Sequence, residues 1–140
     1  MVRKILFLFL AGLIVSGGTA IAKQAGKEKT AISAAEKWLV TVDAGDYAAG
    51  WKESAEFMRN TVKPQQFELS MQAARKPLGR VISRKVQTRT HKTSLPGAPD
   101  GEYVVIQFET SFENKKAAVE TVTPMLDKDG KWRVSGYYIK

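Results

Sequence analysis

The segment of residues 102–140 constrains the fold more than any other part of the chain, because it alternates apolar and polar side chains. Successive residues of a β-strand point to opposite faces, so residues 103–112 predict a half-buried strand whose apolar face needs a cover. Two more strands follow, and Asp127–Gly130 joins them, since Asp-Gly tolerates the positive φ of a tight hairpin turn. One face of the first strand carries Val104, Ile106, Phe108, Thr110 and Phe112.

Residues 30–79 supply the cover, because their apolar side chains recur at helical spacing in three runs. Gly45 separates the first two runs, and Pro64 suits the first turn of the third. A further strand of β-type residues is expected from residue 80 to 93. Three helices followed by four strands predict an α+β fold, in which the helices pack on one face of a curved, four-stranded antiparallel sheet.

The N-terminus has the pattern of a secretory signal. Arg3 and Lys4 precede an uncharged apolar run, and Ala20-Ile21-Ala22 fits the small-x-small cleavage pattern. We expect residues 1–22 to be a signal peptide, residues 23–29 a flexible lead-in and residues 30–140 a single domain. The alternative, an uncleaved anchor, is disfavoured because the apolar run is shorter than the roughly 20 residues of a spanning helix. No transmembrane segment is expected after cleavage.

The net charge and the lack of cysteine limit the classes of partner and site that we expect. The chain carries a formal net charge of +8, and removing Arg3 and Lys4 with the signal leaves about +6. Export to the periplasm or the medium disfavours nucleic acid as a partner, so anionic envelope polymers or lipid head groups would be the natural partners of this excess. The alternative is that the charge only keeps the domain soluble. The chain has no cysteine, which excludes a disulfide and a thiolate metal site.

Basic residues concentrate on the strand expected at residues 80–93. Arg80, Lys85 and Arg89 are candidates for binding an anionic surface, with Lys85 and Arg89 on one face of the strand. The alternative is a solvated strand whose cations pair with acidic residues of neighbouring strands, such as Glu109 and Glu120.

Aromatic residues recur at helical or alternate spacing in this chain. They either belong to the hydrophobic core or line a pocket. In the second case, Tyr47 with Asp43 and Arg75 would supply the polar groups of the pocket. An acid–base enzyme would need a buried carboxylate with a raised pKa, for which Asp43 and Glu36 are the candidates. The full set of pocket candidates is Trp38, Asp43, Tyr47, Trp51, Arg75 and Tyr103.

No catalytic constellation, metal site or cofactor motif is predicted. His91 is the single histidine and has basic neighbours, which oppose a bound cation. Residues 127–130 imitate the start of a calcium loop but lack the glutamate that completes one.

Several of these motifs together resemble a known family. The chain has AEKWL at 35–39, VDAGDY at 42–47 with Trp51, PLG at 77–79, PDGEYV at 99–104, DGKWRV at 129–134 and GYY at 136–138. In these residues it is similar to the bacterial domain-of-unknown-function family 4019, which implies an exported protein without an assigned activity. By element order alone, it resembles more distantly the cone-shaped NTF2-like (cystatin-like) superfamily, which hosts both enzymes and binding modules.

These observations favour an exported, non-catalytic binding or interaction module of the cell envelope, whose partner is a small ligand or an envelope protein. Two alternatives remain open: an enzyme that uses a pocket inside the cone, and a binder of anionic polymer or lipid through the basic strand.

Overall fold

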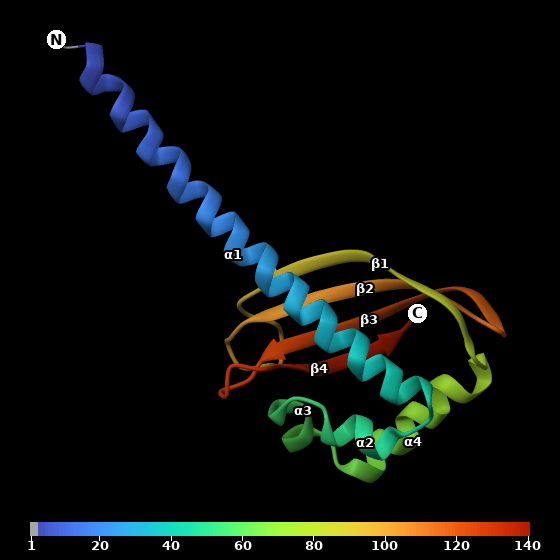
Figure 1. Ribbon diagram of the computed structural model, residues 1–140. Coiled ribbons are helices and arrows are strands. Elements are labelled where there is room, and N and C mark those ends of the chain that lie inside the picture. The colour runs from blue at the N-terminus through green and yellow to red at the C-terminus, as the bar shows by residue number, and fades with distance from the viewer. Residues whose placement is uncertain (1–2) are drawn as a thin grey trace.

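The computed structural model describes the backbone of residues 3–140 and the side chains from residue 18 onward. Helix α1, Arg3–Asp43, extends from a body formed by all the other elements and crosses one face of a sheet (Figure 1). The predicted signal peptide lies largely outside the described side chains and stays a prediction. Among the described residues, no helix is both long and apolar enough to cross a membrane.

Residues 23–29 lie inside α1, although we expect a flexible lead-in there. Apart from Gly26, this stretch consists of Lys, Gln, Ala and Glu, which are strong helix formers. One of its side chains also reaches the body, because Lys27 Nζ lies 2.7 Å from Oε1 of Glu102, the residue before β2. The polar composition therefore reflects a solvated helix that begins to contact the body near Lys27.

Residues 3–140, which the structure describes, contain four α-helices rather than the three that we predict. The expected second helix is divided into α2 (Tyr47–Lys52) and α3 (Glu56–Thr61), because the Ala55 N–H donates to Val134 O of the sheet, at 2.8 Å, and Ser54 Oγ donates to Gly50 O. The remaining helical elements are α4 (Pro64–Arg75) and the 3-10 turn η1 (Lys76–Leu78).

Four antiparallel strands form the sheet in the order β1-β2-β3-β4, which confirms the predicted α+β class. Short turns join β2, β3 and β4, and the Asp127–Gly130 turn lies where the sequence predicts, with Gly130 at a φ of 82°. Helices α2, α3 and α4 gather beside β4 (Figure 1). The strands are β1 (Val81–Lys92), β2 (Tyr103–Phe112), β3 (Lys115–Leu126) and β4 (Trp132–Ile139).

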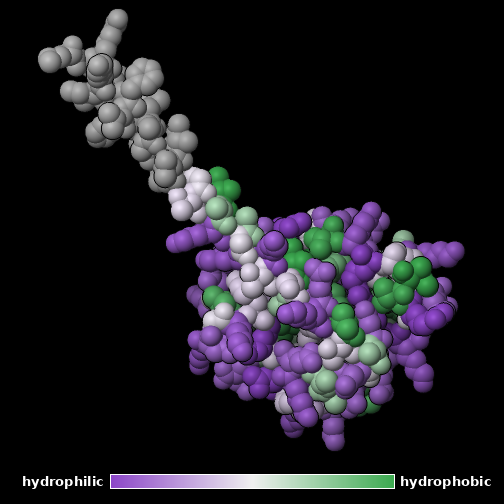
Figure 2. All heavy atoms as spheres, in the orientation of Figure 1, coloured by the Kyte–Doolittle hydropathy of each residue, from purple (hydrophilic) through white to green (hydrophobic). Residues whose placement is uncertain are grey.

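The core lies between α1 and the inner face of the sheet. The face of β2 that we predict to be covered is buried along its whole length, from Val104 to Phe112. Trp38 of α1 packs edge-on against Tyr137 of β4 and Phe67 of α4. The visible surface of the body is mostly hydrophilic, with separate hydrophobic spots (Figure 2).

A register shift in β1 corrects the predicted face of Arg89. Lys85 is opposite Glu109, which is exposed, whereas Arg89 is opposite Ile106, which is buried. The shift between Val86 and Thr88 reverses the alternation, so Lys85 and Arg89 lie on opposite faces of the sheet.

Candidate functional site

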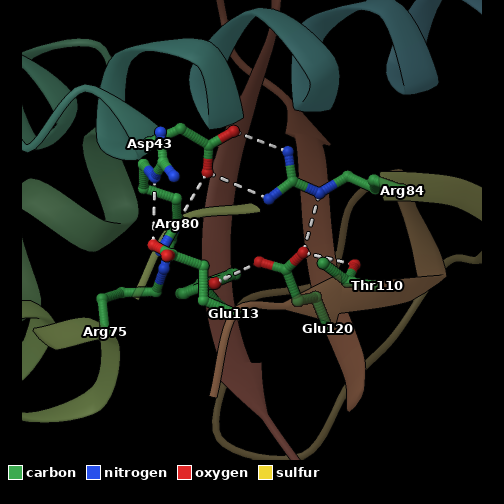
Figure 3. Close-up of polar contacts among 8 residues, drawn as sticks. Asp43, Arg75, Arg80, Arg84, Thr110, Glu113 and Glu120 are labelled. Carbon is green, nitrogen blue, oxygen red and sulfur yellow. Dashed lines mark hydrogen bonds and ion pairs between the residues drawn. The ribbon is translucent and has the colours of Figure 1, made fainter. Parts of the chain in front are cut away.

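The inner face of the sheet carries a cluster of charged side chains where α1 ends. Asp43 is the last residue of α1, Arg75 the last of α4, Arg84 lies on β1, and Glu120 on β3 (Figure 3). We call these four residues the charge network. Its side chains are largely withdrawn from water, with exposed fractions of 25% for Asp43, 15% for Arg84, 5% for Arg75 and 0% for Glu120.

Asp43 binds both arginines of the network. Its Oδ1 accepts a hydrogen bond from Arg75 Nη2 at 2.7 Å and another from Arg84 Nη2 at 3.0 Å. Its Oδ2 accepts a hydrogen bond from Arg84 Nη1 at 2.7 Å, so Arg84 binds the carboxylate through both of its terminal nitrogens. This two-point geometry is the strong form of an arginine–carboxylate pair.

Glu120 is the second acceptor and is completely buried. Its Oε1 accepts from Arg84 Nε at 2.7 Å and from Thr110 Oγ1 at 2.6 Å. Its Oε2 accepts a short hydrogen bond from the Tyr137 hydroxyl. Arg84 therefore bridges the two carboxylates, and every oxygen of both carboxylates has a donor.

The contacts between Asp43 and the two arginines favour the charged forms of these three side chains. Burial by itself raises the pKa of Asp43, but the hydrogen bonds and charges of Arg84 and Arg75 outweigh it and leave that pKa below its ordinary value. Burial likewise works against the charge of Arg84, yet Asp43 and Glu120 hold its pKa above the usual range. Burial, followed by the charge of Glu120, raises the pKa of Tyr137 far above 10. Asp43 is thus a stable carboxylate, the opposite of the acid that the enzyme alternative requires.

Arg75 is the one member of the network whose hydrogen bonding is incomplete. Its Nε and Nη1 are buried and have no hydrogen-bond partner among the residues that the structure describes. The guanidinium carbon lies 5.2 Å from the centre of the Phe112 ring, which attracts the charge but supplies no oxygen or nitrogen acceptor. Buried polar nitrogens without a partner are rare in folded proteins, and a charged one is costly.

A hollow of about 420 Å³ adjoins Arg75. We call it the Arg75 pocket. Of the predicted pocket residues, it contains Asp43, Tyr47 and Arg75, and it adds Arg80, which we predict as an anion-binding residue. Arg80 Nε lies 3.0 Å from Glu113 Oε1 at its rim. The lining residues are Val42, Asp43, Tyr47, Gln72, Arg75, Lys76, Gly79, Arg80 and Glu113.

The other predicted pocket residues are not among those that line this pocket. Trp38 is buried in the core, and its Nε1 donates to Gly50 O at 2.9 Å and to Ser54 Oγ at 3.1 Å. Trp51 Nε1 donates to Val62 O at 2.8 Å. Tyr103 belongs to a separate cluster, and its hydroxyl donates to Pro99 O at 2.5 Å. The polar atoms of these three rings therefore form hydrogen bonds within the protein.

A second hollow, of about 640 Å³, lies between α1 and the β3–β4 turn. We call it the Trp132 groove. Trp38, Trp132 and Val134 give it an apolar wall, with Lys37 and Lys131 also among its lining residues. Trp132 is only half-buried there.

Sequence reasoning missed Arg84 and Glu120 of the charge network, and the Tyr137 hydroxyl that donates to Glu120, as site residues. The sequence does contain a signal for Glu120, because it shares the parity of Ala118, Val122 and Pro124 along β3. A glutamate at an apolar-face position predicts a buried charge with a partner. Glu120 neutralises Arg84 on the inner face, whereas Lys85 on the outer face lies 3.4 Å from Glu109.

Neither a metal cluster nor a histidine-based site is found in the part of the chain that the structure describes. No group of three or more His, Cys, Asp or Glu side chains lies close enough together there to hold a metal ion. His91 lies on β1, with Nε2 3.3 Å from Glu102 Oε1.

Among known proteins, the chain matches one family of unknown function. The model of a family described as "Protein of unknown function (DUF4019)" matches residues 34–137. This range includes the C-terminal end of α1, all the other helices and nearly the whole sheet. No curated protein and no solved structure matches the chain.

Proposed function

The chain belongs to the DUF4019 family, and from that premise we propose that it is an exported, non-catalytic binding module that holds a small ligand in the Arg75 pocket. The observation that carries the proposal is that Asp43 and Arg75 of the charge network line this pocket. Both carboxylates of the network are occupied by arginines and hydroxyls, so the network can position a bound molecule but has no free acid or base to offer.

Two alternatives have less support. An enzyme of the NTF2-like kind would need a carboxyl group with a raised pKa, and the pKa of Asp43 moves in the opposite direction. A binder of anionic polymer or lipid would need its cations on one face, and Lys85 and Arg89 lie on opposite faces. The order of helices and strands is compatible with the NTF2-like superfamily, and we keep that kinship as part of the proposal.

Export is supported by the charged start, the apolar run and Ala20-Ile21-Ala22. We expect the mature protein to begin at Lys23. Intact-mass measurement of the protein recovered from the periplasm or the medium tests this, and a membrane-bound product that retains Met1 would contradict it.

Native mass spectrometry of the protein purified from its own cells tests the binding function. We expect an additional mass that disappears on denaturation. Gln72 is exposed and lines the pocket, so Gln72→Trp should fill the pocket and abolish the additional mass. Gln65→Trp is the matched control, because Gln65 is exposed on the same helix and is not among the lining residues. A wild-type protein without additional mass, or a Gln72→Trp variant that retains it, would contradict the proposal.

A further inference from the structure

We infer that the ligand of the Arg75 pocket presents a small oxyanion, a carboxylate or a phosphate, which accepts hydrogen bonds from Arg75. This inference rests on the proposed function and specifies the chemistry of its ligand. It follows from three observations: the hydrogen bonds that Arg75 lacks, the charge balance around it, and the exposed ion pair at the pocket rim.

The first observation concerns the donors of Arg75. A guanidinium group has five N–H donors and no acceptor, so only an acceptor from elsewhere can satisfy it. Nη2 donates to Asp43 Oδ1 at 2.7 Å, while Nε and Nη1 are buried and have no partner in the described part of the chain. Arg84, the other arginine of the network, uses Nε, Nη1 and Nη2. The fold thus satisfies all three nitrogens of one arginine and only one of the other, which lines the pocket.

The second observation concerns charge. The charge network by itself is balanced, with two arginines against two carboxylates. The pocket adds Lys76 and Arg80 to the cations but only Glu113 to the acids. Four cations therefore face three carboxylates, and one negative charge would balance the site. Oxygen anions form the shortest and strongest hydrogen bonds with arginine, which makes an oxyanion the matching ligand.

The third observation concerns access. Nε and Nη1 of Arg75 are shielded from solvent, so an anion reaches them only when neighbouring side chains move. Arg80 and Glu113 line the same pocket and form an ion pair in which Arg80 is 84% exposed. An exposed ion pair is worth only about 0.2–1 kcal/mol, so that it can separate at little cost. Arg80 would then turn its own charge toward the bound anion.

Titration of the ¹⁵N-labelled protein, observed by NMR at the Arg75 Nε–H signal, tests the inference. Acetate and inorganic phosphate serve as separate probes, at constant ionic strength maintained with sodium chloride. We expect a saturable shift of the Arg75 signal with at least one probe and a dissociation constant in the millimolar range, about 1 mM, as befits a fragment of the ligand. The probe that binds more tightly identifies the oxyanion as a carboxylate or a phosphate.

Three variants test whether the anion binds at Arg75 in the pocket. Arg75→Lys keeps the charge but loses the Nε and Nη1 donors, so we expect binding, followed through backbone amide signals, to weaken about tenfold or more. Lys76→Gln changes an exposed residue at little risk to folding and should weaken binding about two- to fivefold. Lys85→Gln, on the outer face of the sheet, is the matched control and should leave binding unchanged.

The result that overturns the inference is a protein in which neither probe shifts the Arg75 signal. Binding that chloride reproduces, or that Arg75→Lys or Lys76→Gln leaves at full strength, would also overturn it. These failures differ from failure of the proposed function. A ligand mass that Gln72→Trp removes would uphold the binding module even if no oxyanion reached Arg75.

Discussion

The two hollows beside α1 differ in what their walls are made of. The Trp132 groove is the larger, about 640 Å³ against about 420 Å³ for the Arg75 pocket. Trp38, Trp132 and Val134 form the apolar part of its lining, and the indole nitrogen of Trp38 already donates to Gly50 O and Ser54 Oγ. The lining of the Arg75 pocket is mostly polar and charged, and it includes the buried Arg75, two of whose nitrogens have no partner among the described residues. Our proposal therefore rests on the unused hydrogen-bonding capacity of Arg75 and not on the size of the hollow.

The two hollows also differ in what stabilises the protein around them. Around the groove, burying large rings removes apolar surface from water at about 25 cal/mol per Å². At the pocket, the charged groups offset each other's desolvation only while every partner is in place. Removing one member of the network should therefore have a large effect, and removing a half-buried ring of the groove a moderate one.

The largest effect is expected for Glu120→Gln. The change removes the charge that balances Arg84 inside the protein, and breaking a buried pair costs about 3–5 kcal/mol. Urea unfolding measures the loss. Glu109→Gln is the matched control on the exposed face of β2 and should stay within about 0.5 kcal/mol of wild type. Equal losses in the two variants would show that the network does not stabilise the fold.

Trp38 and Trp132 both line the Trp132 groove but differ in how deeply they are buried. Trp38 is 2% exposed, so Trp38→Ala should cost about 3–5 kcal/mol of unfolding free energy, as other large rings in cores do. Trp132 is half-buried, so Trp132→Ala should cost less than about 2 kcal/mol. Denaturant unfolding of both variants provides the measurement, and a Trp132→Ala loss as large as that of Trp38→Ala would place Trp132 in the core.

Acid should weaken the network through Asp43. Its pKa is lowered in the folded protein from 3.8, because Arg84 and Arg75 outweigh the effect of burial. The folded state then binds fewer protons than the unfolded state below about pH 5, so stability is lost as the pH falls through the folded pKa. At neutral pH, Asp43→Asn should cost about 1.5–3 kcal/mol, the worth of hydrogen bonds to a charged group.

Unfolding of wild type and Asp43→Asn from pH 7 down to the acid range measures this effect. The difference between the two should narrow as the pH falls below the ordinary range of an aspartate. Parallel loss of stability in both proteins would mean that Asp43 does not contribute to the acid sensitivity.

The smallest effect belongs to the turn beside the groove. Hydrogen bonds from Arg133, followed by one from the Lys131 N–H, lower the pKa of Asp129 to about 2. Arg133→Gln should move it back toward 3.8. NMR titration of the side-chain carboxyl carbon measures the shift, and an unchanged pKa in the variant would exclude the Arg133 contacts as its cause.

Local patterns in the sequence are enough for the strands and much of the helical region. The alternation along 103–112, the Asp-Gly turn and Pro64 at a helix start each depend on residues within one element, and the structure agrees with all three. The division of the second predicted helix depends on Val134, a residue of the last strand, which accepts a hydrogen bond from Ala55. No local pattern contains that contact.

Sequence patterns alone were thus enough for the α+β class, the antiparallel strands and the family. Asp43, Tyr47 and Arg75, named from the sequence as pocket candidates, line one hollow, and their role there stays a prediction. The connection of Asp43 and Arg75 to Arg84 and Glu120 appears only in the folded chain, because these hydrogen bonds join residues 32, 36 and 41 positions apart. Spacing rules reach only neighbours within a helix or along a strand. A single register shift in β1 was enough to place Arg89 on the other face of the sheet from Lys85, since the period of a strand is two residues.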